Sequence, residues 1–333
     1  MITQHQLDKA GLCARSYVTS GNLAMDAIAV SDAEGQRSRV AFGAEGQEQP
    51  DLCDRQYALA SISKAITGIL TAVLYEQGVL DYETPIVEYV PEFGSSEARR
   101  SIKLGQIFNH STGLPSRFVD GCAQVDYDPA KLLELLCTEE LVDAPGTASR
   151  YSTHTFQLIN EAIKRRLGLS MEQALQQYVC GPCGMTATSF YPSPALALDV
   201  IDHPVPEGAA YEAIQRMEMS GGGLWSTLDD LTKLGRRWLS GSLVSPETFA
   251  KVTAVWNPLP IADGGGVLCR RTLGWDKSLG CFPNQPESGF FHGGATGTLF
   301  YLDPERKLVY VFLTNRWGAG NEQAFDVLGC LYA

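Results

Sequence analysis

Residues 59–78 read LASISKAITGILTAVLYEQG, and this stretch decides the fold. From Ser61 onward its apolar side chains recur at helical spacing and leave only a thin polar face. A helix that is hydrophobic nearly all round belongs in the interior of a protein. Gly78 is the kind of residue that ends such a helix. We therefore expect a buried central helix over residues 61–78.

Ser61 and Lys64 stand at the start of this helix, three residues apart. That spacing puts both side chains on one helix face, so the Lys64 amine is expected beside the Ser61 hydroxyl. A lysine desolvated in a buried helix has a lowered pKa and can accept a proton. Ser63 points away and is the weaker candidate nucleophile. Alone the spacing is weak evidence, because average composition supplies about one S-x-x-K in a chain of this length.

The first part of the chain carries a strand pattern. Residues 15–43 are predicted to form short strands, around Ala24–Val30 and around Ser38–Phe42. The polar segment 31–36 separates them as a turn. After the central helix, residues 81–127 are rich in loops because several prolines interrupt them.

Helical patterns follow these loops, and strands return near the end of the chain. The helices are predicted at Pro129–Cys137, Thr153–Leu167, Ser170–Cys180 and Leu228–Leu239. The β-rich runs Gly297–Leu302 and Leu308–Thr314 flank a turn at residues 303–306, which predicts a hairpin. A last amphipathic helix fits Asn321–Leu331.

These patterns favour an α/β (α+β) fold, with an antiparallel sheet flanked by helices and a mostly helical region inserted. Because both ends of the chain contribute strands, the α/β domain is predicted to be discontinuous, at 1–95 plus 230–333. The inserted helical domain is predicted at 96–229. We expect the active-site cleft between the two domains.

Two further segments can join Ser61 and Lys64 in a site. Tyr151 stands where a loop enters a helix, and its phenol can relay protons if cationic neighbours lower its pKa. The alternative is a half-buried structural tyrosine. His292-Gly293-Gly294-Ala295 precedes a strand, and its glycines let a backbone approach a ligand closely. A free N–H there can face a developing oxyanion; the alternative is a tight bulge with a surface histidine.

The bulk composition excludes some classes of function. Hydrophobic residues make up 44% of the chain, which is ordinary for a globular protein with a sizeable core. A net charge of −12 repels phosphate backbones and anionic lipid, so we expect no nucleic-acid or membrane partner. No secretory signal or membrane-spanning run is visible. The nine irregularly spaced cysteines indicate reduced thiols, so we expect a cytoplasmic protein.

In its motifs the chain resembles the serine β-lactamase and penicillin-binding-protein superfamily, in the branch of class C β-lactamases, family VIII esterases and related acyltransferases. The motifs stand in the family's order and span roughly residues 20–318. They are Leu59-Ala60-Ser61-Ile62-Ser63-Lys64, Glu76-Gln77-Gly78-Val79-Leu80-Asp81, Ile107-Phe108-Asn109-His110-Ser111-Thr112-Gly113-Leu114-Pro115, Pro145-Gly146 with Tyr151-Ser152-Thr153, Gly184-Met185-Thr186, Gly221-Gly222-Gly223-Leu224-Trp225-Ser226-Thr227 with Asp230-Leu231, and His292-Gly293-Gly294-Ala295-Thr296-Gly297 with Asp303-Pro304.

The resemblance implies a β-lactamase/transpeptidase-like fold and a role for each matching residue. Ser61 would attack a carbonyl and become acylated, while Lys64 and Tyr151 would share the general-base work. The backbone N–H groups of Ser61 and Ala295 would form the oxyanion hole. His292 takes the place where lactamases usually carry the lysine of K-T-G. His110 resembles a structural, hydrogen-bonded histidine of the family.

Two departures from the family pattern narrow the expected chemistry. Thr153 replaces the asparagine of Y-x-N that contacts the substrate amide in lactamases, and His292 is typical of esterases. We therefore expect a hydrolase of esters, thioesters or lactones. The alternatives are an acyltransferase, a β-lactamase or D-amino peptidase, and an inactive binding or self-assembling relative.

The expected partner is a small acyl substrate. The candidate substrate-binding residues are His292, Gly293, Gly294, Thr153, Trp225, Phe118 and Trp317, with Trp275 a further aromatic candidate for the acyl pocket. The histidines show no metal-ligand spacing, so we expect no metal and no cofactor.

Overall fold

The computed structural model describes residues 2–206, 208–262 and 267–333. Its centre is a five-stranded antiparallel sheet with the strand order β2-β1-β7-β6-β5. The strands are β1 Asp26–Asp32, β2 Gly35–Phe42, β5 Phe290–Gly293, β6 Leu299–Asp303 and β7 Leu308–Leu313. The strands predicted near both ends of the chain thus pair in one sheet, as the α/β prediction requires.

The strands β6 and β7 are apolar at nearly every position because both faces of the sheet are covered there. Along β7, Val309 and Val311 join the core on one face, whereas Tyr310 and Phe312 join the core on the other. Side chains alternate between faces along a strand, so an uninterrupted apolar run indicates burial on both sides.

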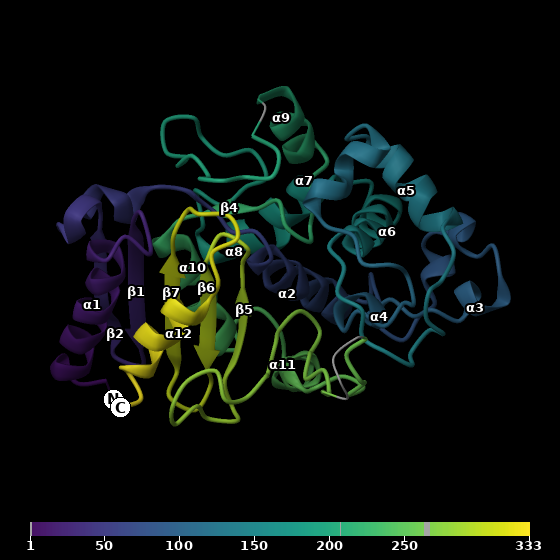
Figure 1. Ribbon diagram of the computed structural model, residues 1–333. Helices are drawn as coiled ribbons and strands as arrows, with labels where there is room; N and C mark the ends of the chain where they lie inside the picture. Colours follow the sequence, from purple (N-terminus) through teal and green to yellow (C-terminus); the bar gives the residue numbers. More distant parts are fainter. Residues whose placement is uncertain (1, 207, 263–266) are drawn as a thin grey trace.

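Helices from distant parts of the chain cover these two faces. α1 (Gln4–Thr19) and α12 (Glu322–Gly329) lie on one face, and α10 (Leu228–Leu239) lies on the other (Figure 1). Gln6 Nε2 donates to the main-chain oxygen of Leu331 at 3.0 Å. The two ends of the chain therefore lie side by side.

The predicted central helix is α2, Ile62–Glu76, and its residues 62–74 are all buried. The helix also touches other backbone directly. A Cβ on Gly68 would lie 2.6 Å from the Leu273 oxygen, so only glycine permits this approach. Gly78, at φ +70°, follows the end of the helix as predicted.

Most of the remaining helices lie in the middle of the chain, beside the sheet (Figure 1). They are η1 Ala44–Gly46, η2 Pro50–Asp54, η3 Ile86–Glu88, η4 Pro91–Phe93, α3 Glu97–Arg100, α4 Gly105–Phe108, η5 Val119–Val125, α5 Pro129–Thr138, η6 His154–Phe156, α6 Gln157–Leu167, α7 Met171–Leu175, the π-helix η7 Gln176–Cys180, α8 Gly181–Cys183, α9 Gly208–Arg216 and α11 Pro246–Thr253. Among them, the helices expected around 129–137, 153–167 and 170–180 are confirmed, and the last is split by the π-turn.

The prediction of strands from residue 15 onward is wrong for residues 15–19, which belong to α1. That helix has a local signal: Thr3 and Gln6 form a capping box, and buried residues recur at helical spacing. Helices α9 and α11 were not expected. His292 precedes the strand β6, as expected, and itself lies within β5, a strand that was not expected.

Two further sequence predictions concern the chain as a whole. No helix in the described ranges is both long and apolar enough to cross a membrane. The division into 1–95 plus 230–333 and 96–229 stays a prediction.

Asp26 at the start of β1 is an unusual feature of the core. Its side chain is 0% exposed, and neither carboxylate oxygen has a hydrogen-bond partner in the described part of the chain. Burial raises the pKa of this carboxyl from 3.8 to about 7. The folded state therefore holds a proton that the unfolded state releases, and its stability falls as the pH rises between these two values.

Asp26→Asn should stabilise the protein by an amount that grows from about pH 4 to pH 7 and is then constant, up to about 4 kcal/mol. The reason is that asparagine cannot ionise. Urea unfolding at pH 5 and pH 9 measures the difference. The exposed Asp8→Asn should give no such pH-dependent gain, and an equal gain at both pH values for Asp26→Asn would contradict the prediction.

Candidate active site

A strained turn delivers Ser61 to the start of α2. The short strand β3 (Tyr57–Ala58) pairs with β4 (Trp225–Ser226), and the Leu59 N–H donates to the Leu224 oxygen at 2.9 Å. Ala60 then adopts φ +46°, a left-handed conformation that is rare for residues other than glycine. Such strain persists only where the surroundings hold it, so the packing of these strands orients the Ser61 hydroxyl.

Lys64 lies one turn along α2, as the spacing predicted, and is 1% exposed. Its Nζ donates to Ser61 Oγ at 3.1 Å, to Thr153 Oγ1 at 3.1 Å and to the Gly221 oxygen at 2.5 Å. Burial lowers the pKa of this amine, with a further decrease from Arg271 and an opposing increase from Tyr151. Thr153, expected to contact substrate, thus holds the lysine.

The Tyr151 ring is half-buried and lies with its centroid 4.7 Å from Lys64 Nζ. Burial alone would raise the pKa of its phenol. The charges of Lys64 and Arg271, together with hydrogen bonding to Ser61 and Lys64, outweigh burial and lower that pKa. Two cationic residues therefore lie beside Tyr151, which is the condition that the sequence analysis set for a tyrosine that relays protons.

Arg271 is the member of the site that the sequence analysis missed. Its guanidinium carbon lies 4.9 Å from the centroid of the Tyr151 ring, and its Nη2 pairs with Asp276 Oδ2 at 3.1 Å. The Asp276 carboxylate and the Tyr151 phenol raise the pKa of Arg271 against the effect of burial. The poorly patterned stretch around it contains no motif that points to a site, so only the fold reveals it.

His292 reaches the site through Arg271. The ring is 4% exposed, its Nδ1 lies 2.8 Å from the Gly293 oxygen, and Arg271 Nη1 lies 3.2 Å from its Nε2. A carbonyl can only accept, so Nδ1 carries the proton and Nε2 accepts from the arginine. Burial, then Arg271 and Lys64, hold the pKa of His292 well below its usual range. His292 is therefore a neutral support for the arginine.

The two glycines after His292 lie where other segments of the chain come close to the backbone. A Cβ on Gly294 would lie 2.3 Å from the Leu59 oxygen, and one on Gly293 would lie 2.2 Å from Asn321 Oδ1. Thr296 Oγ1 also donates to the Ala58 oxygen at 2.8 Å. Gly294 thus makes its close approach to the backbone just before Ser61 and Gly293 to the Asn321 side chain, while the approach to a ligand stays a prediction.

The proposed oxyanion-hole donors lie on these adjoining segments. Within the residues that the structure describes, neither the Ser61 N–H nor the Ala295 N–H donates to another backbone group, while the Ala295 oxygen accepts from Gly318 N at 2.7 Å. Two N–H groups without an intramolecular acceptor suit an incoming anion.

Three of the predicted pocket aromatics lie around the site. The Phe118 side chain is 42% exposed, and its ring stacks 6.1 Å from the Tyr151 ring. Trp225 and Trp317 line a cavity of about 30 Å³, together with Ala60 and His203 among others. The fourth candidate, Trp275, is only 1% exposed and packs against Phe290 and Phe300 in the core.

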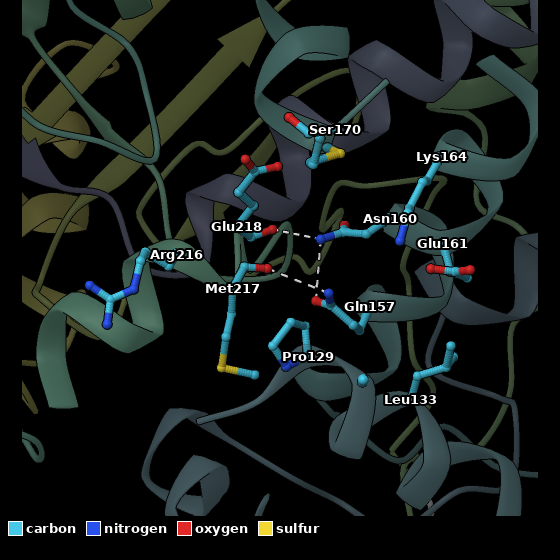
Figure 2. Close-up of a pocket in the computed structure, with 12 residues that line it drawn as sticks. Pro129, Leu133, Gln157, Asn160, Glu161, Lys164, Ser170, Arg216, Met217 and Glu218 are labelled. Carbon is cyan, nitrogen blue, oxygen red and sulfur yellow. Dashed lines mark hydrogen bonds between the residues drawn. The ribbon is translucent and has the colours of Figure 1, made fainter. Parts of the chain in front are cut away.

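A wider cavity, about 390 Å³, lies elsewhere, between α5, α6 and the segment after α9 (Figure 2). Gln157, Asn160 and Glu218 face one another there, and Asn160 Nδ2 donates to the Glu218 oxygen at 2.6 Å. None of the predicted site residues lines this cavity, so its size does not make it the reactive site.

The arrangement around Ser61 suits attack on a carbonyl carbon. A hydroxyl lies beside an amine and a phenol whose pKa values are both lowered, and two backbone N–H groups are available for a developing oxyanion. The structure thus brings together Ser61, Lys64 and Tyr151 and adds Arg271 to them.

Comparison with known proteins identifies the family to which the chain is similar. The family model described as Beta-lactamase matches residues 14–328 of this chain. Esterase EstB of Burkholderia gladioli is 24% identical over an alignment of 371 positions, gaps included, which covers 94% of this chain and 93% of the esterase.

Solved structures resemble this fold over nearly the whole chain. A penicillin-binding protein homologue from Caulobacter crescentus has a TM-score of 0.82 at 18% identity, covering 100% of this chain and 98% of its own. EstCE1, described as a hydrolase with promiscuous acyltransferase activity, has a TM-score of 0.80 at 18% identity, covering 99% of each chain. At such identities the likeness shows the fold alone.

The acid limb is the part of the pH–rate profile in which the reactivity of Ser61 falls as the pH is lowered. Arg271→Met should move this limb to higher pH by about one unit, because a nearby cation lowers the pKa of both Tyr151 and Lys64. The measurement is the rate at which a fluorophosphonate labels Ser61 across the pH range. Arg271→Lys keeps the charge and should keep the limb. Arg270→Met is the neighbouring control; an unshifted limb in folded Arg271→Met would refute the assignment.

Gly294→Ala should lower the free energy of unfolding by about 1–3 kcal/mol, because its Cβ would press on the Leu59 backbone. Fluorophosphonate labelling of Ser61 should slow as well. Gly11→Ala in α1 is the matched control, since a Cβ there meets nothing within 4 Å and should be neutral or stabilising. Urea unfolding distinguishes the two, and equal effects would contradict the packing role.

Proposed function

This chain belongs to the beta-lactamase family, and from that membership we propose that it is a serine hydrolase that cleaves an ester, thioester or lactone through an acyl intermediate on Ser61. The observation that carries the proposal is the buried Lys64 amine, 3.1 Å from the Ser61 hydroxyl. Burying an amine costs desolvation free energy, and an idle binding or self-assembling protein has no need of a buried lysine beside a serine, so that alternative is weaker.

The first half of the reaction acylates Ser61. Its hydroxyl proton passes to Lys64 or Tyr151, whose lowered pKa values suit them to share this work. The Ser61 oxygen then bonds to the substrate carbonyl carbon, and the N–H groups of Ser61 and Ala295 stabilise the negative oxygen. As the carbonyl re-forms, the bond to the leaving alcohol or thiol breaks, and the proton is returned to it.

The second half releases the acyl group. Water loses a proton to the same base, bonds to the acyl carbon and gives a second tetrahedral anion in the same oxyanion hole. Breakdown of that anion frees the carboxylic acid and returns a proton to Ser61. Arg271 stays charged throughout and supports the basic forms of its neighbours electrostatically.

The acyl group of the substrate is proposed to be short. The aromatic cavity beside Ala60, one residue before the nucleophile, measures about 30 Å³. Trp225, Trp317 and His203 bound it, and the His203 ring packs 4.9 Å from that of Trp317. Because these rings already support one another, a long acyl chain would have to displace them.

Acyl transfer to an alcohol or amine is the second candidate, because the same acyl-serine serves both outcomes. EstCE1, which has the same fold, is described as a hydrolase with promiscuous acyltransferase activity. A β-lactamase is less favoured. Thr153 stands where lactamases carry the substrate-binding asparagine, and its hydroxyl already accepts from Lys64.

A reducing compartment such as the cytoplasm is proposed as the place where the protein works. The support is a set of free thiols spread along the chain, at Cys13, Cys53, Cys137, Cys180, Cys183, Cys269, Cys281 and Cys330. Seven of the chain's nine cysteines are buried, as expected for cysteines that act as small apolar residues.

The proposal predicts a single fluorophosphonate adduct on Ser61 by mass spectrometry. It also predicts that p-nitrophenyl acetate is hydrolysed faster than both p-nitrophenyl octanoate and nitrocefin. Ser61→Ala should lower kcat/KM by at least about a thousandfold, because the acyl-enzyme cannot form.

Ser63→Ala provides the matched variant, since Ser63 Oγ donates to the Ala60 oxygen and accepts from Leu224 N, away from the Lys64 amine. The label should still attach to Ser61 in that variant. An adduct elsewhere would disprove the nucleophile, and faster turnover of nitrocefin would move β-lactamase activity to first place.

A further inference from the structure

His110 occupies a strained position next to the site. It follows α4 with φ +58°, and its side chain is 3% exposed. A histidine in the left-handed region is uncommon, and such a conformation survives where surrounding contacts compensate for it. The contacts of His110 are therefore informative.

Those contacts hold both chain neighbours of Tyr151. The His110 main-chain oxygen accepts from the Arg150 N–H at 2.8 Å. The His110 Nδ1 accepts from the Ser152 N–H at 3.3 Å. The imidazole ring also lies against the phenol ring, with 4.3 Å between the centroids. One residue thus fixes Tyr151 from both sides and along its ring.

The protonation state of His110 suits this work. Because Nδ1 accepts from a backbone N–H, the ring is neutral and its proton is on Nε2. Burial, then the charges of Arg271 and Lys64 and the neighbouring His292, hold the pKa of His110 well below its usual range. Nε2 has no hydrogen-bond partner among the described residues, so the hydrogen bond of the ring is the one at Nδ1.

We propose that His110 is a positioning residue that clamps the Tyr151 backbone and so holds the phenol against Lys64 and Arg271. The proposal rests on the proposed function, in which Tyr151 shares the general-base work. A phenol released from the clamp moves away from both cations and becomes a weaker acid. Errors of about 1 Å in such placement cost about a hundredfold in rate.

His110→Gln and His110→Asn form the decisive pair. Asparagine places its Oδ1 where histidine has Nδ1, and it tolerates a left-handed backbone, so it keeps the bond to Ser152. Glutamine carries its polar atoms one bond farther out and loses that bond. We expect the glutamine variant to lose about a hundredfold in kcat for p-nitrophenyl acetate with little change in KM. Its acid limb should move up by about one pH unit, while the asparagine variant keeps the wild-type limb.

Thermal unfolding of both variants gives the structural baseline. A purely structural histidine would lower the melting temperature of both variants and leave the limb unchanged, and that result would overturn the proposal. An asparagine variant whose limb shifts as far as that of the glutamine variant would overturn it as well. If the glutamine variant does not fold, His110→Gly takes its place, because glycine suits φ +58° and also loses the bond to Ser152: a limb shifted relative to the asparagine variant supports the clamp, and an unshifted limb refutes it.

The proposed function fails by a different result. Activity retained in Ser61→Ala, or a fluorophosphonate adduct on another residue, would remove the nucleophile whatever the His110 variants do. A dead Ser61→Ala together with an unshifted His110→Gln would remove only the clamp.

Discussion

The interior amine of Lys64 is the constraint on which the site depends. An amine at 1% exposure is stable only if acceptors surround it, and it finds them on three separate segments, at Ser61, Thr153 and Gly221. Satisfying this one side chain therefore requires α2, the start of the α6 region and the glycine-rich segment to meet at one place. The burial that makes these acceptors necessary also lowers the pKa of the Lys64 amine, so that the amine can act as a base.

Positive charge in the site divides its residues into two groups. Lys64 and Arg271 favour the ionised form of the Tyr151 phenol, which lowers its pKa. The same two cations disfavour protonation of His110 and His292, which stay neutral. Neutral rings can accept hydrogen bonds, from a backbone N–H in one case and from the Arg271 guanidinium in the other. Thus the same two positive charges lower the pKa of the Tyr151 phenol and keep His110 and His292 neutral.

Local patterns were the successful part of sequence analysis. The helix predicted at Leu228–Leu239 begins and ends at those residues, and the strands around the turn at 303–306 pair as a hairpin. The failure at residues 15–19 was also local, since the capping box that opens α1 was overlooked. Arg271 is a different kind of omission. It stands in a stretch without a motif, and its importance comes from Tyr151, which lies more than a hundred residues away in the chain.

The sequence by itself determined that Ser61 and Lys64 are neighbours, because three residues of helix bring two side chains to one face whatever surrounds them. It also determined that this helix is buried, because its composition leaves no other place for it. Only the tertiary structure decided what the neighbours of that pair are. Gly294 proved to fit against the Leu59 backbone, and His110 proved to hold the chain on both sides of Tyr151. Such contacts join segments far apart in sequence, and their energy depends on distances that no local pattern contains.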